Sequence, residues 1–179
     1  GTIALVSGPS ADRATGNIDI SSASSFRGAT GEVNITTGHS YGSGTFAYSG
    51  GIQLRTGGAT DGHGGHIKLE VGAGDGTTVA GGDVTITAGL STADAQSGGA
   101  ITIIAGEGSN TDVMDGGDGG HVILAGGAAF GSNSQDKGGS VDITGGKALA
   151  GTGGTISVRS GPSALTSSGQ FYLQTYNAG

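Results

Sequence analysis

The sequence predicts an all-β chain, and three observations lead to this prediction. The chain has 179 residues, of which 42 are glycine. Eleven short segments alternate apolar with variable residues, and glycines stand at their ends. Alternation with a period of two is typical of a strand with one buried face, and glycine suits sharp corners or close backbone approach.

All eleven segments follow one template, x-Φ-x-Φ-x-small-Gly, in which Φ is apolar and x is variable. The Φ pairs are Ile3/Leu5, Ile18/Ile20, Val33/Ile35, Ile52/Leu54, Ile67/Leu69, Val84/Ile86, Ile101/Ile103, Val122/Leu124, Val141/Ile143, Ile156/Val158 and Phe171/Leu173. We call the first six residues of each copy a ladder segment. These are residues 2–7, 17–22, 32–37, 51–56, 66–71, 83–88, 100–105, 121–126, 140–145, 155–160 and 170–175. Nine copies close with glycine, Ala23 and Tyr176 being the exceptions, and a glycine precedes every ladder segment.

Successive repeats are 15 to 21 residues long and differ by even numbers. Even insertions preserve which face of an extended segment each residue occupies. We therefore expect each repeat to form one coil of a single-stranded parallel β-solenoid (β-helix). About eleven coils, with a thin aliphatic core and glycine corners, would make residues 1–179 a single domain. Val84 and Ile86 are then expected to stack under Ile101 and Ile103.

Composition and charge exclude several classes of partner. The net charge is −7 with only seven Lys and Arg, so no basic patch for nucleic acid or an anionic membrane is expected. No apolar run approaches the 18 residues that suggest a membrane-spanning helix. Without cysteine the chain has no disulfides or thiolate metal sites. Because it begins with glycine rather than Met, we interpret it as a segment or subunit of a longer or polymeric assembly.

Chemistry-bearing residues are few. Asp112, Asp115 and Asp118 lie three apart in the longest linker and are the candidates for Ca²⁺, which prefers oxygen ligands. The competing interpretation is that they make local hydrogen bonds in a glycine-rich turn. No nucleophile motif or recurring carboxylate pair is present, so we expect no enzyme, no catalytic residues and no cofactor. A polysaccharide-cleaving enzyme and an ice-binding surface, which would need a regular Thr ladder, are the less favoured alternatives.

Large side chains outside the Φ ladder are the candidates for contacts with subunits or partners, although they also suit the covering of their own loops. Together with the terminal segment they are Tyr41, Phe46, Tyr48, Met114, Phe130, Phe171, Tyr172 and Tyr176. Asn34-Ile35-Thr36 forms a glycosylation sequon, which makes Asn34 a modification candidate.

The template is clearest in GGDVTITAG (81–89) and GGTISVRSG (153–161). It resembles the Gly-rich β-solenoid repeats of extracellular fibre and adhesin-type proteins, most closely the arrays in long extracellular proteins of algae and some large viruses. The resemblance implies a location outside the cell or on a cell or virion surface. We expect a structural protein that forms a filament or appendage with itself, through head-to-tail and lateral contacts. The alternative is an adhesive, carbohydrate-binding module with glycans as partners.

Overall fold

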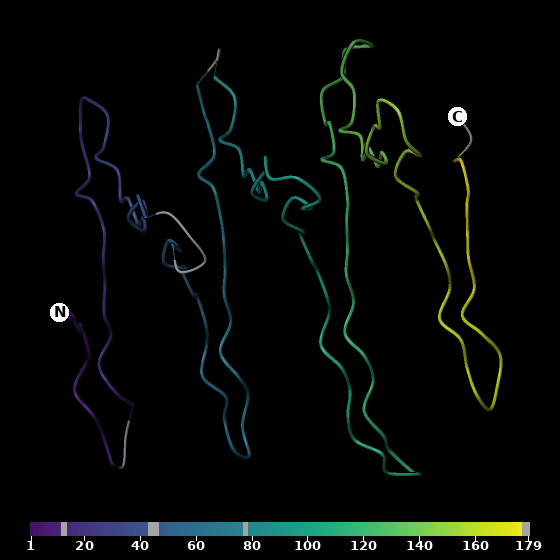
Figure 1. The fold of residues 1–179 in the computed structure, drawn as a ribbon, viewed down its shortest axis with the longest axis horizontal. Coiled ribbons are helices and arrows are strands. Elements are labelled where there is room, and N and C mark those ends of the chain that lie inside the picture. The colour runs from purple at the N-terminus through teal and green to yellow at the C-terminus, as the bar shows by residue number, and fades with distance from the viewer. Residues whose placement is uncertain (12–13, 43–46, 77–78, 177–179) are drawn as a thin grey trace. The chain divides into compact units, whose positions relative to one another are not determined.

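A computed structural model describes residues 1–11, 14–42, 47–76 and 79–176. In these ranges the chain has no helix and no strand. It separates into two units, Gly1–Thr85 and Ile86–Gly179, each of which is described by itself. Within each unit, long extended runs alternate with places where the chain turns back on itself (Figure 1).

The predicted all-β solenoid with an aliphatic core is therefore wrong for the single chain. All 22 Φ side chains are exposed, and no described residue is buried. The accessible surface is 18060 Å². A folded monomer of this mass has about 7,700 Å² by the usual scaling of surface with mass. The chain alone thus leaves uncovered the apolar surface that a folded domain would bury.

The sequence pattern favours extended backbone without determining which segments pair. Period-two alternation of β-branched residues favours extended backbone, but it does not say which segment supplies the hydrogen-bond partner. Within each of the two units, no backbone hydrogen bond between described residues joins two ladder segments. Successive segments of one unit, such as those of Ile101/Ile103 and Val122/Leu124, are not paired, so the predicted stacking of successive coils is wrong within each unit.

The alternation of faces itself is visible in the outward x positions. Lys68 and Glu70 form an ion pair, and Tyr172 donates a hydrogen bond to Gln170. Two further pairs, Asn34 with Glu32 at 3.1 Å and Ser140 with Asp142 at 3.0 Å, have the same spacing. Residues two apart project from one face of extended backbone. The x residues of a ladder segment therefore share one face, which we call the outward face, and the Φ residues share the opposite face. Both faces are exposed in the described residues.

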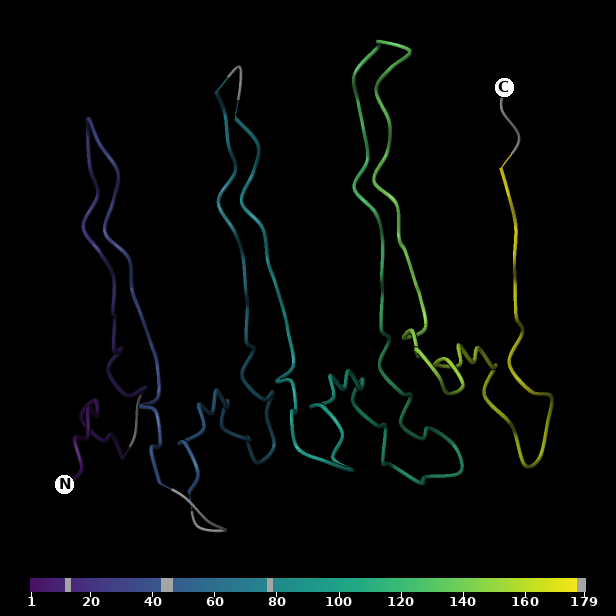
Figure 2. The same cartoon turned by 45° about the horizontal axis from the view of Figure 1, so that its top comes forward.

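The linkers between ladder segments are closed by glycines. We call the first residue of each linker its closing residue and the last its approach glycine. The reversal that a linker makes, including these two residues, is called an arm. In six arms the approach glycine N–H donates to the carbonyl oxygen of the closing glycine. These bonds are Gly65 to Gly57 (3.5 Å), Gly99 to Gly89 (2.8 Å), Gly120 to Gly106 (2.9 Å), Gly139 to Gly127 (2.8 Å), Gly154 to Gly146 (2.8 Å) and Gly169 to Gly161 (2.9 Å). They bring the two ends of each of these linkers together, and Figure 2 shows the reversals from a second direction.

Candidate functional site

Close approach of the backbone explains why glycine precedes some of the ladder segments. At each of the ten arms, a Cβ built on the approach glycine would lie 2.6 to 3.8 Å from the end of the preceding ladder segment or from the closing glycine. At Gly82 it would lie 2.6 Å from Val71 Cγ1, and at Gly154 it would lie 2.8 Å from the Gly146 nitrogen. Heavy atoms make favourable contact at about 3.5–4.0 Å. The tightest arms therefore have no room for a side chain at this position.

The closing glycines behave differently. No atom lies within 4 Å of the position a Cβ would take at the nine closing glycines, which are Gly8, Gly38, Gly57, Gly72, Gly89, Gly106, Gly127, Gly146 and Gly161. No described glycine has φ in the left-handed region. The two described non-glycine residues with positive φ are Asp61 and Ala95, both inside linkers. Contacts within one chain thus give no reason for glycine at the closing position.

The arm contacts fix the direction in which the Φ face points. Every second residue counted from the approach glycine is a Φ residue or the small residue. These four positions therefore lie on the same face of an extended segment. The Cβ position of the approach glycine faces the side chain of the small residue in the preceding segment, as in Gly99 and Ala88 at 3.4 Å. Ile52 and Val141 remain 53% and 51% exposed, whereas Leu165, inside a linker, is 96% exposed. Most Φ side chains are thus less exposed than Leu165, although Ile3 and Leu173 are 100% and 91% exposed.

The longest linker, 106–120, is shaped by turn hydrogen bonds. Asn110 Oδ1 accepts from the Asp112 N–H at 3.0 Å, and Asp112 Oδ1 accepts from the Met114 N–H at 2.8 Å and the Asp115 N–H at 3.2 Å. These donors, Met114 first, lower the pKa of the Asp112 carboxyl. Asp112 therefore caps a turn, which is the competing interpretation of this acidic cluster.

No metal ligand set is formed in the part of the chain that the structure describes. The Asp112, Asp115 and Asp118 side chains do not come together with each other or with a histidine as a group of three. His39 contacts Tyr41 edge to face, with ring centroids 4.5 Å apart. The described residues also enclose no pocket. The geometry offers no place where a small ligand would be surrounded.

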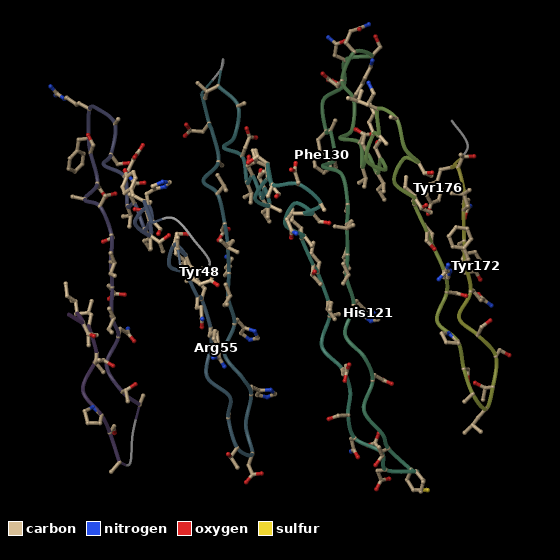
Figure 3. All side chains as sticks on the ribbon, viewed as in Figure 1. Tyr48, Arg55, His121, Phe130, Tyr172 and Tyr176 are labelled. Atoms are coloured by element: carbon tan, nitrogen blue, oxygen red, sulfur yellow. The ribbon has the colours of Figure 1, made fainter. Side chains whose placement is uncertain are left out.

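The candidate contact residues fall in four parts of the chain: 41–48, 114, 130 and 171–176. Phe46 lies outside the described residues. Tyr48, Phe130, Tyr172 and Tyr176 project from the backbone into the space around it (Figure 3). Phe130, Tyr41 and Met114 are as exposed as aliphatic linker residues such as Leu165, whereas Tyr48 is 77% exposed and the Φ residue Phe171 is 62% exposed. Exposure therefore does not distinguish the described candidates from the other apolar residues. Asn34 is exposed on the outward face, where its amide donates to Glu32.

Sequence reasoning missed the side chains that shape the other linkers. Ser163 Oγ accepts from the N–H groups of Leu165 and Thr166. Asn133 Oδ1 accepts from the Gln135 N–H at 2.9 Å, and Ser25 Oγ from the Gly28 N–H at 3.0 Å. Such turns have a recognisable signal, because Ser, Asn and Asp bond to backbone two or three residues ahead.

Comparison with known proteins adds no family. No family model matches the chain, and neither a curated protein nor a solved structure is significantly similar to it. Over the described ranges, no helix is long and apolar enough to cross a membrane.

Proposed function

We propose that the protein is a structural, self-assembling protein that builds an extracellular filament or surface appendage. The observation that carries this proposal is the set of eleven ladder segments, whose backbone groups have no partner segment and whose 22 Φ side chains are all exposed in the described chain. Extended backbone with free N–H and C=O groups is a template for pairing with another chain. The function follows from what a single copy leaves unsatisfied.

The composition of the ladder segments supports assembly over solubility. Segments such as DVTITA (83–88) and AITIIA (100–105) are rich in β-branched residues, carry little charge and contain no proline. These are the features of sequences that pair as stacked strands. Seven Lys and Arg and 14 Asp and Glu together make up only 12% of the chain, so few charges interrupt the edges. The extracellular location rests on the resemblance of the glycine template to fibre and surface repeats.

Sedimentation and electron microscopy of the purified chain test the proposal. We expect concentration-dependent, sedimentable fibres with strand-type circular dichroism. The dissolved chain below the assembly threshold should show little regular secondary structure. Dispersed monomers at high concentration, without fibres, would refute the proposal. Saturable glycan binding by such monomers would favour the adhesive alternative.

A further inference from the structure

We infer that the partner of each ladder segment is the same segment of a second copy of this chain, stacked parallel and in register. This inference rests on the proposed self-assembly and specifies its geometry. It has three steps: the unsatisfied backbone groups, the match of linker lengths, and the chemistry of the stacked rows.

The first step concerns the backbone groups. In six arms the approach glycine N–H already donates across the arm to the closing glycine, as from Gly99 to Gly89 at 2.8 Å. Within each unit, no backbone hydrogen bond between described residues joins two ladder segments. The N–H and C=O groups of the ladder segments are therefore left to bond to another chain.

The second step concerns register. Counted in chain order, the ten linkers hold 9, 9, 13, 9, 11, 11, 15, 13, 9 and 9 residues. A copy shifted by one repeat would set linkers of unequal length together at six of nine positions. An antiparallel copy would oppose the nine-residue linker 57–65 and the fifteen-residue linker 106–120. Only the parallel, in-register copy matches every linker.

The third step concerns what the stack would bury. Rows of identical Val, Ile and Leu side chains about 4.8 Å apart would form along the stacking direction. The Φ positions supply 22 such rows, and 21 of them are β-branched or Leu. The stack therefore covers the surface that a single chain exposes.

Spin labels test the register directly, because the chain has no cysteine of its own. Single cysteines would be placed at outward x positions near the beginning, middle and end of the chain, as Ser21→Cys, Thr85→Cys and Ser157→Cys. Labels stacked about 4.8 Å apart exchange spin, so the three-line spectrum collapses to one line. Dilution with a large excess of unlabelled chain is the control and should restore three lines.

We expect collapse to a single line in fibres at all three sites, with a fibre-diffraction reflection near 4.8 Å along the fibre axis. Fibres that keep three lines at all sites would overturn the register while leaving the proposed self-assembly in place. Collapse at Thr85 alone, the central site, would show antiparallel stacking and would also overturn it. Absence of fibres from the unlabelled chain would refute the proposed function, and the inference with it.

Discussion

Substitution of Gly154 by alanine tests whether glycine is required for arm closure. The Gly154 N–H donates to the Gly146 carbonyl oxygen at 2.8 Å. A Cβ at Gly154 would lie 2.8 Å from the Gly146 nitrogen and 3.5 Å from its Cα. Both atoms belong to the backbone and cannot rotate away as a side chain would. The base of the arm must therefore open in the Gly154→Ala variant.

The expected cost follows from two contributions. Loss of the hydrogen bond costs about 0.5–1.5 kcal/mol. Crowding by one added carbon costs about 1–3 kcal/mol if the neighbours do not move away. Partial relaxation of an exposed arm favours the lower ends, so we expect about 2 kcal/mol, or roughly a thirty-fold change in an equilibrium constant. Gly151→Ala is the matched control, because it lies in the same linker and no atom lies within 4 Å of its Cβ position.

The assay is the critical concentration for assembly, measured as the protein left in the supernatant after sedimentation. Gly154→Ala should raise it by about thirty-fold, on the assumption that the arm is closed in the assembled chain. Alanine also reduces the entropy of the unassembled chain, by about 0.4–1 kcal/mol, but this affects both variants alike. Equal critical concentrations for Gly154→Ala and Gly151→Ala would refute the close-approach explanation of these glycines.

Three further predictions follow from charge, pKa and backbone conformation. Because a net charge of −7 is repeated in every copy, added salt should lower the critical concentration, and a flat salt series would contradict this. The lowered pKa of Asp112 means that its turn is stabilised above the ordinary value of 3.8 and loses this stability as pH falls through the lowered pKa. A pH titration of the Met114 amide resonance should show this, and Asp112→Asn should abolish it. Ala95 has φ of 57°, so Ala95→Gly should relieve about 1.5 kcal/mol of strain. The greater freedom of glycine in the unassembled chain offsets about 0.7 kcal/mol of this, so the critical concentration should fall about four-fold. An unchanged or higher value would show that the conformation is not strained.

The sequence predicts the local backbone better than it predicts the fold. The alternation of x and Φ residues predicts that residues two apart share a face, and Lys68 and Glu70 pair at this spacing. Glycine at the corners is explained by close approach at residues such as Gly82, whereas positive φ occurs at Asp61 and Ala95 instead. The absence of a sheet in the single chain was not predictable from the sequence. A repeated strand template is compatible with pairing to its own next copy and with pairing to another chain. The acidic linker had two interpretations, and only the hydrogen bonds of Asp112 select the turn.

The even differences between repeat lengths have a different meaning once the arms are known. The Cβ position of an approach glycine must lie on the same face as the Φ residues that follow it, and the glycine must meet the end of the segment before it. The linker 106–120 is six residues longer than 146–154, yet Gly120 bonds to Gly106 at 2.9 Å much as Gly154 bonds to Gly146 at 2.8 Å. An even insertion leaves this face and the closing bond intact, whereas an odd one would turn the following ladder over. The parity is therefore a condition for closing each arm, and it holds before any copy stacks on another.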